Sequence, residues 1–219
     1  MRAWLAALLL AAAPAWAAPF AVPVGAARIG LEAPAGFADT GFTGSPRLRE
    51  IAESLTSASN RILLFAISDG DLRSFMQGDR PELRRFMIAV TPKALEDQNV
   101  TVRQFEAFVG DALRGLGNPP PQGDVLKYLD AQPRGKAALL GELRRDTTVV
   151  SVLQGTRLPD RSRFGAKPEY LLSTTTLLNL RGKALSVSVY SSYESADDLG
   201  WIKLVTARWI EDLQRLNVR

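Results

Sequence analysis

The sequence of 219 residues contains no histidine and no cysteine. The missing histidine removes the most common general base of enzymes, the central residue of a Ser-His-Asp triad and the most common metal ligand. The missing cysteine removes thiolate nucleophiles and thiolate ligands for zinc, and it leaves packing rather than disulfides to stabilise the fold. The composition therefore excludes most familiar catalytic and metal centres.

Long apolar runs are also lacking after the first residues. The alanine- and leucine-rich run at residues 3–13 is too short to span a bilayer as a helix, and the small-residue pattern Ala15-Trp16-Ala17 follows it. This order is typical of a secretory signal peptide. It predicts that residues 1–17 are a signal peptide cleaved after Ala17. The protein is then expected to be periplasmic or secreted, with no stable membrane insertion after cleavage.

Charge of one sign is not concentrated anywhere in the chain. There are 27 Lys and Arg residues against 23 Asp and Glu residues, which gives a formal net charge of +4. These charges alternate along the sequence rather than forming a block. Because a nucleic-acid interface needs a clustered basic patch, we expect no nucleic-acid partner.

Several apolar runs with clear boundaries predict strands. Residues 61–68 and 84–92 are apolar at both parities, as in strands that are covered on both faces. Residues 147–155, 169–180 and 184–193 are also predicted strands, and the short turn between the last two predicts a hairpin. No assignment is made for residues 119–146, whose short apolar clusters suit either strands or helical turns.

Helix starts are indicated by capping residues. Ser45 precedes a proline and an apolar repeat, Thr101 and Gln104 form a capping-box pattern, and Ser195 is followed by Asp198 in the first turn. The last of these helices carries an apolar stripe at helical spacing, opposite a face of balanced charge. Such a helix is expected to cover a sheet rather than a bilayer. The stripe consists of Ile202, Val205, Trp209, Leu213 and Leu216.

The order of these elements predicts the fold class. Strand runs separated by helices, with an antiparallel hairpin near the end, indicate an α+β fold. We expect a central antiparallel sheet flanked by helices, an α/β/α sandwich. Residues 18–27, rich in proline, glycine and alanine, are expected to be a flexible leader, and residues 28–219 a single domain.

The best acidic cluster is Asp69-Gly70-Asp71, with Asp79 further along the chain. Clustered carboxylates are the hard oxygen ligands that Ca²⁺ prefers, so Asp69, Asp71 and Asp79 are weak candidates for a metal site. The EF-hand spacing fails, however, and an Asp-Gly-Asp between a strand and a helix is typical of a turn with a helix cap. No catalytic residue and no cofactor are predicted.

Three other kinds of chemistry stay open. Ser186 and Ser188 lie close in sequence to Lys183, which permits a serine–lysine pair, although serines alternating with apolar residues are typical of the wet face of a strand. The 23 carboxylates permit paired Asp/Glu hydrolysis, without any spacing that supports it. The arginines permit binding of an anionic ligand or a membrane surface.

The two ends of the chain resemble PsbP-like and DcrB-like domains. The resemblance rests on "APAGF" at residues 33–37, on "LRGKALSVSVY" followed by the acidic "SADD", and on the pattern from Trp209 to Asn217. It implies an α/β/α sandwich with a central antiparallel sheet. Many members of that family are exported and are not enzymes, and no shared catalytic residues can be transferred.

These observations together predict an exported, soluble, non-catalytic binding or accessory protein of the bacterial cell envelope. Its expected partner is an unknown envelope protein or a small ligand. The alternatives are a histidine-free hydrolase that uses Asp/Glu or a Ser-Lys pair, and a peripheral membrane or anionic-ligand binder.

Overall fold

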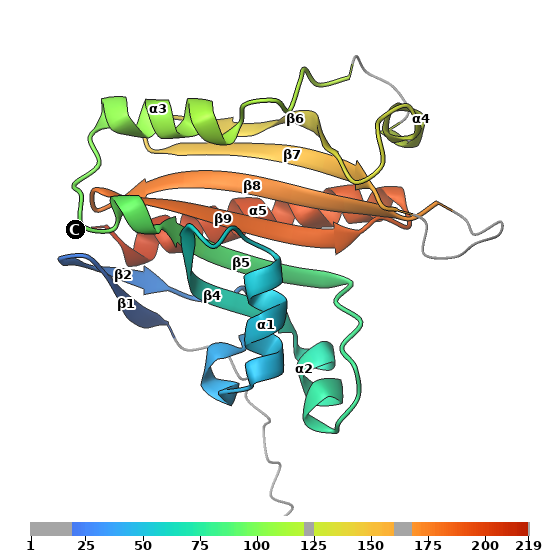
Figure 1. Cartoon of the computed structure of the whole chain (residues 1–219), viewed down its shortest axis with the longest axis horizontal. Helices are drawn as coiled ribbons and strands as arrows, with labels where there is room; N and C mark the ends of the chain where they lie inside the picture. Colours follow the sequence, from blue (N-terminus) through green and yellow to red (C-terminus); the bar gives the residue numbers. More distant parts are fainter. Residues whose placement is uncertain (1–18, 121–124, 160–167, 219) are drawn as a thin grey trace, which may run out of the picture.

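One large antiparallel sheet organises the computed structural model, which describes residues 19–120, 125–159 and 168–218. Helices cover both faces of this sheet, so the fold class is α+β with the expected three layers (Figure 1). The predicted signal peptide, residues 1–17, lies outside the described residues. Among the described helices, none is both long enough and apolar enough to cross a bilayer.

The sheet has seven strands in the spatial order β3-β4-β5-β9-β8-β7-β6, and every neighbouring pair is antiparallel. The central pairing of β5 with β9 joins the first part of the chain to the last, because Arg85 lies opposite Ser191. In chain order the strands are β3 (Phe37–Asp39), β4 (Asn60–Ser68), β5 (Arg85–Pro92), β6 (Ala137–Arg145), β7 (Val149–Arg157), β8 (Tyr170–Leu180) and β9 (Lys183–Ser192).

Strand β5 shows why the central strands are apolar at both parities. Met87 and Ala89 pack in the core beneath the C-terminal helix, whereas Phe86, Ile88 and Val90 pack in a second core on the opposite face. Alternate residues of a strand point to opposite faces, so a sheet with two covered faces needs apolar residues at every position. The prediction from residues 84–92 is therefore confirmed.

The first face is covered by α5 (Ala196–Leu216), whose buried residues include Ile202, Trp209 and Leu213. Trp209 is 1% exposed and its indole Nε1–H donates to the Glu32 carbonyl at 2.8 Å. The apolar stripe predicted from the sequence thus faces the sheet. The helix begins at the expected N-cap, where Ser195 and Asp198 form a capping box.

A two-stranded hairpin, β1 (Phe20–Val24) and β2 (Ala27–Leu31), lies beside α5. The structure differs here from the flexible leader expected at residues 18–27. Val24 is fully buried in the core under α5, and Asn217 exchanges two 2.9 Å hydrogen bonds with the backbone of Gly30. The side-chain amide of Asn217 thus acts as a strand neighbour, a long-range contact that local composition does not show.

The other face carries three of the described helices. On this face α1 (Pro46–Ser54) and α2 (Asp69–Met76) cover β4 and β5. α3 (Val102–Ala112) lies on the same face, over β7 and β8 (Figure 1). α4 (Val125–Asp130) packs against β7 on the α5 side, where Leu129 lies over Gly155. Two short 3-10 turns, η1 (Gly41–Thr43) and η2 (Lys93–Leu95), follow β3 and β5. The helix starts predicted at Ser45 and Thr101 are confirmed.

Candidate functional site

A polar cleft of about 950 Å³ opens at the end of the sheet where β5 begins and β9 ends. It lies between the start of α2, the loop before β5, and the start of α5. Its described lining includes six carboxylates and three guanidinium groups, so negative charge is in excess. The charged residues are Asp71, Asp79, Arg80, Glu82, Arg84, Arg85, Glu194, Asp197 and Asp198.

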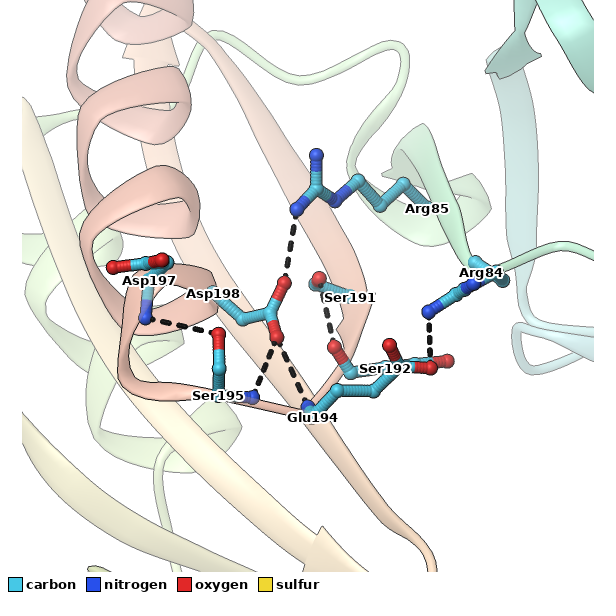
Figure 2. Close-up of polar contacts among 8 residues, drawn as sticks. All are labelled: Arg84, Arg85, Ser191, Ser192, Glu194, Ser195, Asp197 and Asp198. Carbon is cyan, nitrogen blue, oxygen red and sulfur yellow. Dashed lines mark hydrogen bonds and ion pairs between the residues drawn. The ribbon is translucent and has the colours of Figure 1, made fainter.

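Asp198 is the central group of the inner wall (Figure 2). Its Oδ2 accepts the backbone N–H groups of Glu194 at 2.9 Å and Ser195 at 3.0 Å, and its Oδ1 accepts from Arg85 at 2.9 Å. Burial opposes ionisation of this carboxyl, but these donors outweigh it and lower the pKa of Asp198 below its ordinary value. Asp198 is therefore held ionised by the protein itself.

Arg85 is fixed on its other side by an aromatic ring. Its guanidinium carbon lies 4.1 Å from the centroid of Trp201, whose ring in turn contacts Phe37 at 6.1 Å between centroids. A guanidinium above an indole face is attracted by the ring quadrupole. Arg85 is thus held between Trp201 and Asp198, and it connects the first turn of α5 to the first residue of β5.

Asp71 builds the opposite wall. Its Oδ1 accepts from the backbone N–H of Glu82 at 2.8 Å and of Leu83 at 3.4 Å, and its Oδ2 accepts from the Ser68 hydroxyl at 2.9 Å. These bonds hold the loop before β5 against the start of α2. Leu83 has a positive φ of 55°, a conformation that costs energy for a residue other than glycine and persists only when neighbours hold it.

The structure brings together only part of the acidic cluster considered from the sequence. Asp71 and Asp79 line the cleft, whereas Asp69 is exposed at the start of α2 and is not part of the lining. The oxygens of Asp71 already accept three protein donors, and the N-cap of α2 is Ser68 rather than a residue of the Asp-Gly-Asp segment. In the described part of the chain, no group of three His, Cys, Asp or Glu side chains is placed to hold a metal ion.

Among the remaining charges of the cleft, three carboxylates and one guanidinium group are available to a ligand. Arg84 pairs with Glu194 at the rim, where both side chains are more than half exposed. Asp79, Glu82 and Asp197 are exposed, and their carboxylates have no ion-pair partner among the described residues. Arg80 is the corresponding guanidinium without such a partner. Three exposed carboxylates therefore lie around the inner wall of the cleft, which the contacts of Asp198 and Arg85 hold in place.

The serines and the lysine of the proposed pair do not meet. Lys183 is buried, and its Nζ donates to the carbonyls of Glu96 at 2.7 Å and Gln98 at 2.8 Å. Ser186 and Ser188 differ from Lys183 by odd numbers of residues along β9, so their side chains point to the other face of the sheet. Lys183 ties the η2 region to the sheet, and geometry gives it no nucleophile at Ser186 or Ser188.

The sequence indicated several residues of this cleft but not that they lie together in one site. Asp71 and Asp198 were each visible as residues near a helix start, while Arg84 and Arg85 were visible only as the charged start of a strand. The pairing of Arg85 with Ser191 brings these segments together. The available signal was that both strands carry polar residues at ends that meet if the strands pair antiparallel.

Comparison with known proteins gives little at the level of sequence. No family model matches the chain, and no curated protein matches it. Among solved structures, the Saccharomyces cerevisiae Ran-binding protein Mog1p is similar with a TM-score of 0.39 and 13% identity, over 93% of this chain and 94% of that chain. A mutant of Mog1 gives a TM-score of 0.38 and 14% identity, over 92% and 94%.

These comparisons correct two predictions. The resemblance to PsbP-like and DcrB-like domains was wrong as a family assignment, because no family model matches the chain. The residues that carried the resemblance form the turn before β3, the β8–β9 hairpin, and the start and end of α5. The predicted periplasmic or secreted localisation is likewise supported by none of these comparisons, and it is not carried into the proposed function.

Proposed function

We propose that this protein is a non-catalytic binding protein, and that its polar cleft holds a basic segment of a protein partner. The proposal rests on a difference between two sets of carboxylates in the cleft, those bonded within the protein and those that are exposed. The carboxylates of Asp71 and Asp198 already accept hydrogen bonds from protein donors. Those of Asp79, Glu82 and Asp197 are exposed and have no ion-pair partners among the described residues.

This arrangement suits recognition better than catalysis. A carboxylate that acts as a general base needs a raised pKa and access to a substrate proton, but Asp198 has a lowered pKa and all its contacts are internal. Exposed carboxylates on a fixed wall lose little hydration when they meet a guanidinium or an ammonium group. Arginine is the favoured partner because its planar fork binds carboxylates through two parallel hydrogen bonds.

An anionic ligand is disfavoured at this site. Arg84 and Arg85 are already paired with Glu194 and Asp198, and among the cleft residues described Arg80 is the remaining guanidinium without a partner. The excess of carboxylates would repel a phosphate or an acidic peptide. The basic ligand is attracted locally although the whole chain carries a formal charge of +4, so binding is expected to weaken as salt screens the local field.

The test is fluorescence anisotropy with a labelled decapeptide of alternating arginine and serine. We expect the triple variant Asp79→Asn, Glu82→Gln, Asp197→Asn to bind roughly 3- to 100-fold more weakly, since exposed ion pairs contribute about 0.2–1 kcal/mol each. The matched control is Glu50→Gln, Glu106→Gln, Glu211→Gln, three exposed residues away from the cleft that give the same change in net charge.

The control variant is expected to bind within about twofold of the wild-type chain, because screening limits the effect of distant charges. Equal weakening in both triple variants would show that only net charge matters, and the assignment of the cleft would fail. Equal binding of a decapeptide of alternating glutamate and serine would have the same consequence. Thermal melting of each variant confirms that it is folded.

A further inference from the structure

A second feature, independent of the polar cleft, is an unpaired stretch of sheet edge. β3 pairs with β4 only from Phe37 opposite Ser68 to Asp39 opposite Ala66, and the chain then leaves the sheet. The residues from Arg61 to Leu64 therefore have β5 on one side and no strand on the other, among the described residues. An open strand edge presents backbone N–H and C=O groups that can pair with another chain.

The open edge forms the floor of a groove rather than a flat border. A cavity of about 700 Å³ lies between this edge, α1 and the η1 turn. Its apolar lining includes Ala52 from α1 and Ile62, Leu64 and Phe65 from β4, and polar groups surround these. Phe42, on the same η1 turn as the lining residue Gly41, is 72% exposed. The groove thus offers both backbone pairing and apolar contact.

The charges of the groove give a bound chain a direction. Arg49 is exposed on α1 without a partner among the described residues, and the exposed Lys93 lies at the Asn60 end of β4, where its Nζ donates to the Ala58 carbonyl. Arg61 at the same end is already paired with Glu96 and donates to the Pro23 carbonyl. A peptide that continues the line of β3 runs antiparallel to β4, so its C-terminal end lies at this basic end. A C-terminal carboxylate or an acidic side chain would meet Lys93 there.

A bulge in β4 favours a short peptide over a second copy of the chain as the ligand of this edge. The register with β5 shifts between Ile62 and Leu64, which marks a bulge that bends the edge. A bulged edge of four residues is poorly suited to regular pairing with a second copy of the same chain. A short extended peptide that contacts both the edge and α1 meets the same geometry without needing a long, straight ladder.

We propose that the Arg61–Leu64 edge of β4 binds an extended peptide of a partner protein as an added antiparallel strand. The peptide carries an apolar side chain toward Ala52 and Phe65, and an acidic residue or free carboxylate at its C-terminal end toward Lys93. This mode, strand addition, takes affinity from main-chain hydrogen bonds and specificity from side-chain pockets. The preferred charge is opposite to that of the ligand proposed for the polar cleft.

The experiment selects ligands without assuming one. Purified full-length protein is panned against displayed random heptapeptides with free C-termini, and the tightest peptide is synthesised with each backbone amide N-methylated in turn. We expect enriched peptides to be acidic at the last two positions. We expect N-methylation to weaken binding roughly 3- to 10-fold at alternate positions only, because alternate amides of a strand face the edge.

A charge variant places the peptide in the groove. Arg49→Glu with Lys93→Glu is expected to weaken binding at least tenfold, while the control Arg103→Glu with Arg208→Glu, two exposed arginines elsewhere, leaves it within threefold. The triple variant of the polar cleft should bind the acidic peptide as the wild type does. Failure to enrich any peptide, N-methylation effects without a period of two, or loss of binding in the cleft variant would each overturn the proposal.

Discussion

Asp198 shows how one side chain can serve both a helix and a cleft. It accepts backbone N–H groups that α5 leaves unpaired at its start, and it fixes Arg85 against Trp201. The Arg85 side chain is 40% exposed, so the ion pair itself is weakened by solvent screening. The backbone donors are therefore expected to supply most of the stabilisation at this residue.

Replacing Asp198 by Asn should lower the free energy of unfolding at pH 7 by about 1–2 kcal/mol, because the charged acceptor is lost. The pKa of Asp198 is lowered in the folded chain relative to its ordinary value of 3.8. Its contribution is therefore fully present above that value and is lost as pH falls through the folded pKa. Urea unfolding of both chains at pH 7 and at pH 3 measures this difference.

The deficit of the Asp198→Asn variant should shrink at pH 3. Asp197→Asn is the matched control, since Asp197 is exposed in the same helical turn and its carboxylate has no partner among the described residues. A deficit at pH 3 as large as that at pH 7 would show that the charge of Asp198 is not what stabilises the fold.

At the scale of elements, α5 holds three segments of the chain together. It packs on β8 and β9 and also touches β2, and Trp209 bonds to Glu32 just after β2. Its exposed side carries residues such as Leu204, which is 51% exposed. The tryptophans of this helix thus divide their roles: Trp209 is core, whereas Trp201 is half-buried and supports Arg85.

Trp209→Ala is expected to lower the free energy of unfolding by about 3–5 kcal/mol, the usual cost of truncating a large buried side chain. Trp209→Phe should cost less, about 1–3 kcal/mol, because it mainly leaves the Glu32 carbonyl without its donor. Leu204→Ala on the exposed side should change stability by less than about 0.5 kcal/mol. Chemical unfolding measures all three, and a Trp209→Ala variant as stable as the wild type would mean that α5 does not cover the sheet.

Features that depend on neighbouring residues could be predicted from the sequence, and features that depend on distant residues could not. The capping boxes at Thr101 and Ser195 and the doubly apolar strands follow from local spacing. The strand β6 could not be assigned, because two register shifts with β7 break its alternation. Strand β1 and its pairing with β2 were missed because the anchor of this hairpin, Asn217, lies 187 positions from Gly30.

The same distinction applies to the cleft. Asp71 was identified as a candidate, but its bonds to the Glu82 and Leu83 amides depend on the path of a loop, which composition does not fix. Of the three exposed carboxylates, Asp79 was considered only as a metal ligand, and Glu82 and Asp197 were not singled out as site residues. The three share a site only because β5 and β9 pair. Local chemistry predicted the residue types, and the long-range pairing decided which of them share a site.

At the scale of the whole molecule, β5 and β9 are the junction on which cooperativity depends. β5 belongs to the part of the sheet built before residue 93, and β9 belongs to the part built after residue 136 (Figure 1). The core under α5 contains residues from both parts, including Met87 and Val187. Neither part can bury its apolar face on that side without the other.

We therefore expect a single cooperative thermal transition. Differential scanning calorimetry should give a ratio of calorimetric to van't Hoff enthalpy of about one, as for two-state unfolding. A calorimetric enthalpy clearly larger than the van't Hoff value would show that the two parts of the sheet unfold separately. That outcome would contradict the role assigned to the β5–β9 pair.

The contact between Asn217 and Gly30 has a consequence for how the chain is made. A ribosome adds about 5–20 residues per second, so the 187 positions between these residues correspond to roughly 10–40 s of translation. During that interval β2 is already synthesised while the amide that will pair with its backbone does not yet exist. The apolar side of the β1–β2 hairpin therefore stays uncovered until α5 has been synthesised.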